Sequence, residues 1–148
     1  MLKESPERFV SDRVGRIDAE DPDSLIVDLS TYQVFDADSA VVTLMYTNIA
    51  SNGLGIVVWN LEPGQENDFH RHPDTEHIHV MLAGEAEYTL ADRPPVIVSV
   101  GQAVMVPANI PHGIRNTGTQ RCSYLAINSP GNYQKVLADR AEPAGVEA

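Results

Sequence analysis

Short apolar runs alternate with polar turn residues along most of the chain, from Leu25 to Ile127. The runs are rich in Val, Ile, Thr and Tyr, which favour strands, and Gly, Pro and Asn separate them. Many short strands at regular spacing predict an all-β domain, built as an antiparallel sandwich or barrel. We expect strands at Leu25–Leu29, Tyr32–Phe35, Val41–Ile49, Leu54–Leu61, His77–Leu82, Glu85–Leu90, Val96–Val100, Ala103–Val106 and Ser123–Ile127.

The two ends of the chain follow a different pattern. Ser5, Pro6 and Glu7 form a helix-start signal, which predicts a short helix to about Val14. A closing helix is expected from Asn132 to Arg140. We therefore expect an N-terminal arm over residues 1–24, a β-barrel over residues 25–128, and a C-terminal helix and tail over residues 129–148.

Length, charge and cysteine content narrow the class of protein. A chain of 148 residues fits one domain. The formal charge of −11 disfavours nucleic-acid partners, which need a basic surface. The N-terminus lacks the apolar segment of a secretory signal, and apolar runs such as Leu54–Leu61 are too short to span a membrane. Together with a single cysteine, Cys122, these features predict a soluble cytoplasmic protein without membrane partners.

Histidines supply the candidate chemistry. Four of the five, His70, His72, His77 and His79, fall within ten residues, and His112 follows a Pro-rich turn. Alternate residues of an extended segment share a face, so His70 pairs with His72, and His77 with His79. Imidazole is a ligand for Zn, Cu, Fe and Ni, and convergent buried imidazoles are costly without a partner. The pattern indicates a metal site, and the alternative is a set of scattered histidines.

Two segments resemble the signature motifs of the cupin superfamily. The first runs from Gly64 to Gly84 and reads G-Q-E-N-D-F-H-R-H-P-D-T-E-H-I-H-V-M-L-A-G, and the second runs from Gly101 to Asn116 and reads G-Q-A-V-M-V-P-A-N-I-P-H-G-I-R-N. In the second motif Asn109 replaces the usual glycine, and Asn also tolerates a positive φ. The resemblance implies a cupin jelly-roll barrel, with short terminal helices in this chain, that holds one divalent metal ion.

The resemblance also implies a ligand set. The first motif usually carries a glutamate where this chain has His77, counted back from Gly84. The set is then His70, His72, His77 and His112, as in four-histidine cupins. The alternative is three histidines with Glu76. The implied ion is Fe, Mn, Ni, Zn or Cu, with Fe or Mn favoured.

Such a site predicts an enzyme that acts on a small organic molecule. A dioxygenase-type oxidoreductase is favoured because an all-nitrogen ligand set suits a redox metal. A lyase or isomerase, or a barrel that binds a small ligand without turnover, are the alternatives. His79 and Tyr88 are the candidate catalytic residues, although each can equally serve as ordinary interior packing. Tyr46, Trp59 and Tyr88 are candidates for the pocket wall. Edge strands near Leu25 and Val41 predict a homodimer.

Overall fold

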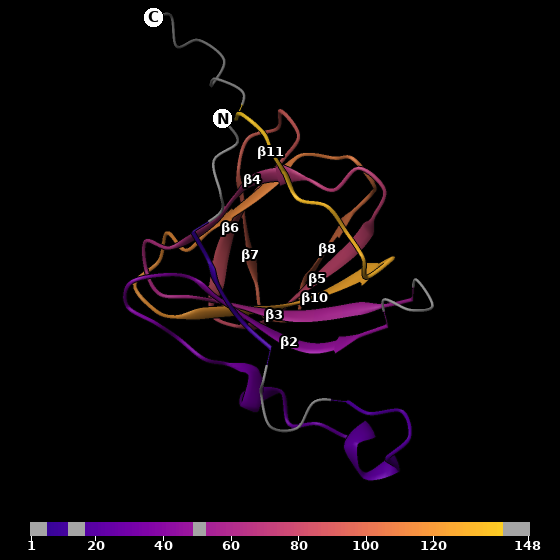
Figure 1. Cartoon of the computed structure of the whole chain (residues 1–148). Coiled ribbons are helices and arrows are strands. Elements are labelled where there is room, and N and C mark those ends of the chain that lie inside the picture. Colours follow the sequence, from indigo (N-terminus) through magenta and orange to yellow (C-terminus); the bar gives the residue numbers. More distant parts are fainter. Residues whose placement is uncertain (1–5, 12–16, 49–52, 141–148) are drawn as a thin grey trace, which may run out of the picture.

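Two sheets face each other and close into a barrel (Figure 1). We describe the protein from a computed structural model, which covers residues 6–11, 17–48 and 53–140. One sheet has the order β1 (Arg8–Val10), β2 (Val41–Thr47), β3 (Gly55–Leu61), β10 (Cys122–Ser129), β5 (Glu76–Ala83) and β8 (Ala103–Val106). The other has the order β11 (Val136–Leu137), β4 (Glu66–Arg71), β9 (His112–Arg115), β6 (Glu85–Leu90) and β7 (Val96–Ser99).

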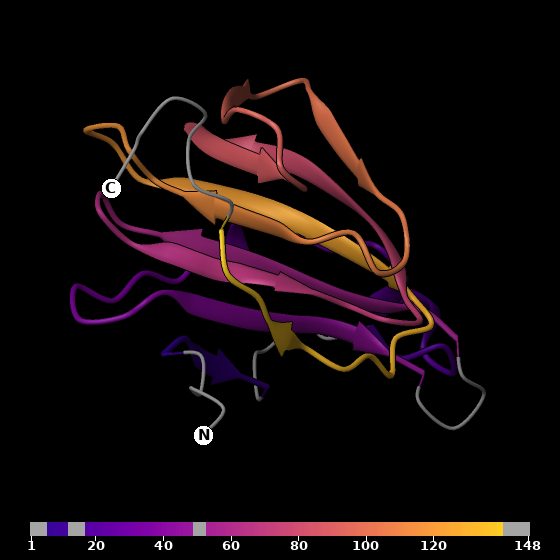
Figure 2. The ribbon, with the colours of Figure 1, turned by 90° about the horizontal axis from the view of Figure 1, so that it is seen from above.

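Strand β10 lies between β3 and β5 and aligns their inward side chains. Tyr124 stands opposite both Trp59 and Met81, and Asn128 stands opposite His77. The Trp59 and Tyr124 rings are nearly parallel, with centroids 6.1 Å apart. Figure 2, viewed from above, shows these three strands running side by side. The interior is therefore apolar around Trp59 and Tyr124 and polar toward Asn128.

Two turns in the motif segments need unusual backbone angles. Gly84 has φ +66°, and a Cβ atom there would lie 2.4 Å from the carbonyl oxygen of Arg121, so only glycine fits. Asn109 has φ +69°, which confirms that asparagine takes the role of the usual glycine at this turn. Its Oδ1 atom accepts a 2.7 Å hydrogen bond from Arg71, which fixes the turn against the end of β4.

Two short 3-10 helices, η1 (Pro22–Leu25) and η2 (Leu29–Tyr32), lie outside the barrel on the β2 side (Figure 1). Tyr32 is fully buried, and it packs with Met45 and Val58 on the outer face of this sheet. Its carbonyl oxygen accepts hydrogen bonds from Thr43 at 2.6 Å and Asn60 at 3.1 Å. The segment before β2 thus covers one sheet of the barrel.

The strands expected over Leu25–Leu29 and Tyr32–Phe35 are wrong, because this region forms η1, η2 and irregular backbone. Val27, Leu29 and Tyr32 pack individually against the outer face of the sheet, whereas Leu25 and Ile26 are exposed. β2 is paired on both sides, with β1 and β3, so these segments offer no free edge for the expected homodimer. The homodimer stays a prediction. β4 and β9 correspond to the extended segment expected at His70 and to a strand expected at His112, and the polar character of these short sequences left their bounds undefined.

The terminal helices are also corrected. Arg8–Val10 forms β1, which pairs in parallel with β2, and the expected helix beyond Ser11 lies outside the described residues. Within Asn132–Arg140 the chain is extended and contains β11. Backbone partners on β2 and β4 outweigh local helix signals at both ends. Among the described residues, no helix is long and apolar enough to cross a membrane.

Candidate metal centre

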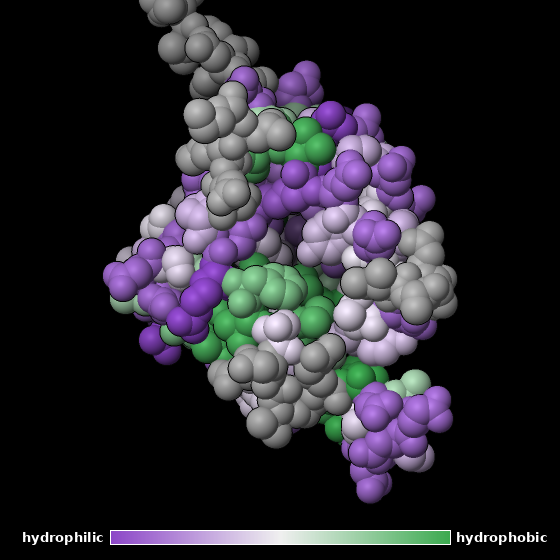
Figure 3. All heavy atoms as spheres, in the orientation of Figure 1, coloured by the Kyte–Doolittle hydropathy of each residue, from purple (hydrophilic) through white to green (hydrophobic). Residues whose placement is uncertain are grey.

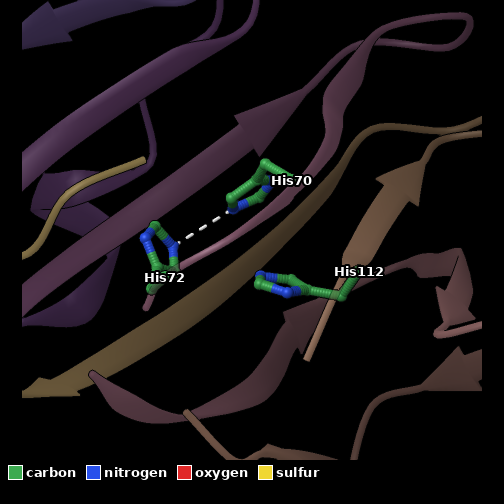
Figure 4. Close-up of side chains that lie close together, drawn as sticks. All are labelled: His70, His72 and His112. Atoms are coloured by element: carbon green, nitrogen blue, oxygen red, sulfur yellow. Dashed lines mark hydrogen bonds between the residues drawn. The ribbon is translucent and has the colours of Figure 1, made fainter. Parts of the chain in front are cut away.

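All five histidines lie in the barrel interior, with at most 6% of their surface exposed. His70 lies on β4 opposite His112, the first residue of β9, and His72 follows β4. His77 and His79 both point inward from β5 because alternate residues of a strand share a face. Figure 4 shows His70, His72 and His112 converging from two strands. The rings of His77 and His112 lie 4.6 Å apart between centroids.

Hydrogen bonds to backbone carbonyls set the proton position on three of these rings. The Nδ1 atoms donate to carbonyl oxygens that can only accept: His70 to Asp68, His72 to Gln134 at 2.6 Å, and His112 to Ile110 at 2.9 Å. Each ring therefore carries its proton on Nδ1 and a lone pair on Nε2. Metal-binding histidines show the same arrangement when a backbone carbonyl accepts a hydrogen bond from the ring nitrogen that does not bind the metal.

A side chain, that of Asn128, sets the proton position on the His77 ring. Its Nδ1 atom lies 3.1 Å from Oδ1 of Asn128, and Nδ2 of Asn128 donates to the carbonyl oxygen of Gly55 at 3.2 Å. The bond to Gly55 orients the amide so that its oxygen faces His77. The Nδ1 atom of His77 is thus the donor, and its Nε2 atom also carries a lone pair.

The Nε2 atoms are left without suitable protein partners. Those of His77 and His112 are buried and have no hydrogen bond. Those of His70 and His72 lie 3.1 Å apart, a contact marked in Figure 4, and neither carries a proton to share. Lone pairs this close repel each other, and a cation removes both the repulsion and the unsatisfied acceptors. The donor set therefore fits a transition-metal ion.

Donor atoms fall into two overlapping groups in which all atoms lie within 4.8 Å of one another. His70, His72 and His112 form one group, and His77, His79 and His112 form the other. His112 is shared. The structure thus brings the four predicted ligands together around His112, and it places His79 within the same reach.

Burial keeps these imidazoles neutral. Desolvation lowers the pKa of His72 and of His77 to about 4, and that of His112 to about 3. It also lowers the pKa of His70 and His79 well below the ordinary value. Near neutral pH the rings therefore present lone pairs rather than charges, which is the state that binds metal.

His79 differs from the other four in its partner. Its Nδ1 atom lies 3.0 Å from the hydroxyl oxygen of Tyr88. A hydroxyl both donates and accepts, so this bond permits either tautomer of His79. Burial raises the pKa of Tyr88 well above its usual value, so its hydroxyl keeps its proton. This pair can hold or pass a proton, whereas the hydrogen bonds of the other four rings keep the proton on Nδ1 and the lone pair on Nε2.

Glu76, the alternative ligand, lies on the outside of the barrel. Its side chain is exposed at the start of β5, whereas the neighbouring His77 is 3% exposed. Strand alternation separates the two residues, since only one of two neighbours can face the interior. In this structure the carboxylate does not reach the histidine cluster.

A cavity of about 90 Å³ lies beside the histidines. The barrel face in Figure 3 is hollowed near its centre, between hydrophobic residues below and hydrophilic residues above. Trp59 lines the cavity as expected, but Tyr46 and Tyr88 do not. Four histidines line it with residues from several strands and both chain ends: Glu7, Phe9, Val42, Val57, Trp59, Asn67, His70, His72, His77, His79, Ala126, Asn128, Tyr133 and Lys135.

The sequence reasoning missed five polar residues of this wall: Glu7, Asn67, Asn128, Tyr133 and Lys135. The Tyr133 ring lies 4.7 Å from that of His72, and burial raises its pKa. Lys135 donates to Glu7 at 2.7 Å and to Asn67 at 2.8 Å. Glu7 and Lys135 belong to segments expected to be helical, and no local pattern marks them as neighbours of the motif histidines.

The family comparison agrees with this fold and cluster. The cupin-domain family model matches residues 57–128, which include all five histidines. The chain contains a cupin domain. A structure with a double-stranded β-helix domain from Klebsiella pneumoniae has a TM-score of 0.71 at 24% identity, covering 78% of this chain and 97% of that one. This likeness shows the shared cupin fold.

Two curated proteins resemble the cupin domain and its surroundings. Protein SchB of Streptomyces halstedii is 28% identical over 114 residues, which are 72% of this chain and 80% of that protein. The dimethylsulfoniopropionate lyase DddQ of Ruegeria pomeroyi is 38% identical over 66 residues, which are 45% of this chain but 32% of the lyase. The crystal structure of that lyase superposes with a TM-score of 0.60 at 27% identity, covering 71% of this chain and 56% of the lyase.

Proposed function

We propose that this protein is a metal-dependent cupin enzyme that acts on a small organic molecule. The observation that carries the proposal is the set of four buried Nε2 lone pairs, on His70, His72, His77 and His112, which have no protein donor. These four rings would hold one divalent transition-metal ion, with iron or manganese favoured. Such an ion, when bound, supplies Lewis-acid polarisation and, for a redox metal, chemistry with dioxygen.

The remaining residues would position the substrate and move protons. The cavity is small, with a volume of about 90 Å³, so it favours a compact substrate. His79 with Tyr88 is the proposed acid–base pair, because their hydrogen bond leaves the proton free to lie on either partner. Apolar walls from Val57 and Trp59 would pack against carbon atoms of the substrate.

Dioxygenase-type oxidation is the first candidate reaction. An all-nitrogen ligand set suits a redox-active metal, and the exposed position of Glu76 leaves the predicted ligand set without a carboxylate. Enols, diketones and phenols are the substrate classes to test. Consumption of dioxygen that depends on both substrate and metal is the expected result.

Lyase activity is the second candidate, and a separate observation favours it. The similarity to a dimethylsulfoniopropionate lyase extends over sequence and structure, although it spans only part of that protein. An elimination needs a base near the substrate, and His79 with Tyr88 supplies one. Anaerobic release of dimethyl sulfide from dimethylsulfoniopropionate would select this reaction over the oxidative one.

The metal is tested by elemental analysis of untagged protein and two neighbouring variants. The wild type is expected to hold close to one transition-metal ion per chain. His77→Ala removes an inward lone pair and is expected to weaken binding by about 100-fold or more, whereas Glu76→Ala, on the outer face, is expected to retain the metal. Loss of metal in Glu76→Ala alone would reassign the ligand.

A wild-type protein that holds no metal after reconstitution with iron, manganese, nickel, zinc and copper would overturn the proposal. The protein would then be a barrel that binds a small ligand without turnover.

A further inference from the structure

Both ends of the chain contribute to the cavity wall beside the histidines, from outside the segment matched by the cupin family model, whereas Trp59 and Asn67 of the same wall lie inside that segment. Glu7 precedes β1, and Tyr133 and Lys135 precede β11. These segments come together because β1 pairs with β2, and β11 pairs with β4.

Lys135 is the one lysine or arginine among the described residues that line the cavity. Its Nζ atom lies 5.0 Å from the centroid of the Trp59 ring and donates to Oδ1 of Asn67 at 2.8 Å. Its side chain is 18% exposed. Three contacts with the wall, including the one with Glu7, hold the ammonium in a defined place next to the histidine cluster.

Glu7 is a poorly satisfied partner for this ammonium. Its Oε1 atom accepts from Lys135 at 2.7 Å, but its Oε2 atom is buried and has no hydrogen bond. A buried ion pair recovers its desolvation cost only when the remaining acceptors are also bonded. The pair is therefore weak support for folding, and Glu7 lines the cavity at a place that suits an anion.

We propose that Lys135 binds a carboxylate group of the substrate, and that Glu7 occupies this position when the cavity holds no ligand. The inference rests on the proposed function, because it names the substrate class for the same site. A short carboxylate would place its anionic end on Lys135, in the position of the Glu7 carboxylate, and its other end toward the histidines. Glu7 gives up its place to the ligand, and the three-residue pairing of β1 leaves this segment few bonds to break.

Fluorescence of Trp59 tests the proposal without turnover. Trp59 is the only tryptophan in the chain, and it lies against Lys135, so a titration reports binding at this wall. The probes are propionate and its neutral counterpart propionamide, added to chelator-treated protein so that no metal contributes. The wild type is expected to bind propionate about 10- to 100-fold more tightly than propionamide, as a charge-assisted hydrogen bond predicts.

Two variants with opposite expected effects on propionate binding separate the roles of Lys135 and Glu7. Lys135→Met keeps the unbranched shape of the side chain without its ammonium group and is expected to abolish the preference for propionate. Glu7→Gln keeps the shape and removes the competing charge, so it is expected to tighten propionate binding about 10-fold. Arg93→Met removes one positive charge at an exposed position away from the cavity and is expected to bind like the wild type.

Equal binding of propionate and propionamide by the wild type would overturn the proposal, as would an unchanged preference in Lys135→Met. Should Lys135→Met fail to fold, Glu7→Gln decides: unchanged or weaker propionate binding overturns the proposal. Metal content and turnover are measured separately. A preference for propionate that depends on Lys135, in a protein that holds no metal, would support this inference and contradict the proposed enzyme function. A protein that holds metal and turns over a substrate but shows no preference for propionate would support the enzyme function and contradict this inference.

Discussion

The two ends of the barrel interior are built by the same strands but have opposite energetics. Along β5, His77 and His79 face inward at one end and Met81 faces inward toward the other. Along β10, Asn128 lies opposite His77, and Tyr124 lies opposite Met81. Burial of Met81 and Tyr124 stabilises the fold, whereas burial of the histidines lowers their pKa and costs free energy on protonation.

This contrast shows that strand alternation selects which side chains are buried, while their chemistry decides what burial achieves. The apolar end holds the sheets together. At the histidine end, the Nδ1 atoms have hydrogen-bond partners, whereas the Nε2 atoms of His77 and His112 are buried without one. This lowers the stability of the metal-free protein, and a bound ion offsets the loss. We therefore expect substitutions at the apolar end to change stability and substitutions at the histidine end to change metal binding.

Acid is expected to have the largest effect, and to act through the histidine end. The five histidines have folded pKa values below 6.5, so the unfolded chain binds protons first as the pH falls. Their contribution is fully present above pH 6.5 and is lost as the pH falls toward about 4. At about 1.4 kcal/mol per pKa unit for each group, the loss by pH 5 is on the order of 5 kcal/mol or more.

Urea unfolding of chelator-treated protein at a series of pH values measures this loss. Metal-loaded protein is the control and should resist acid to a lower pH, because the ion competes with protons for the same nitrogen atoms. A free energy of unfolding that stays level between pH 7 and pH 5 in the metal-free protein would contradict the expected burial of neutral imidazoles.

Truncation at the apolar end is expected to cost stability and spare the metal. Met81 is 2% exposed, and Met81→Ala should lower the free energy of unfolding by about 2–5 kcal/mol through lost burial and a cavity. Denaturant unfolding measures the loss, and elemental analysis should find the metal content of the wild type. Val80→Ala, on the half-buried outer face of β5, is the control with a smaller loss.

A loss of metal affinity in Met81→Ala as large as that in His77→Ala would contradict the separation of the two ends. It would mean that packing at the apolar end sets the positions of the histidines, and that the two ends act as one unit.

The smallest effect on stability is expected at the boundary between the two ends. Tyr88→Phe removes the hydroxyl partner of His79 and should cost about 1 kcal/mol. Tyr124→Phe is the matched control, since it deletes a hydroxyl bonded to Nδ2 of Asn67 at 2.9 Å. If His79 and Tyr88 move a proton, only Tyr88→Phe should shift the pH profile of turnover. Equal pH profiles for Tyr88→Phe and Tyr124→Phe would mean that the pair of His79 and Tyr88 only packs in the interior.

Much of the barrel could be predicted because strand signals are local. Alternation allows only one of His77 and Glu76 to face inward, and the spacing to Gly84 favoured His77, which the structure places inside. The spacing of the motif residues also predicted the turn at Asn109. The errors lie where local signals are weak or misleading. Pro6 after Ser5 marks a helix start in isolation, yet Arg8–Val10 joins β2, because backbone pairing outweighs a capping preference.

The sequence by itself determined the class of fold and the five imidazoles, because strand periodicity and motif spacing are properties of neighbouring residues. Only the tertiary structure decided which nitrogen atom of each ring faces the cavity, since the partners of His72 and His77 are Gln134 and Asn128, more than fifty residues away. It also decided that Glu7 and Lys135 meet beside Trp59. Contacts between the two chain ends depend on the closed barrel, and no local pattern encodes them.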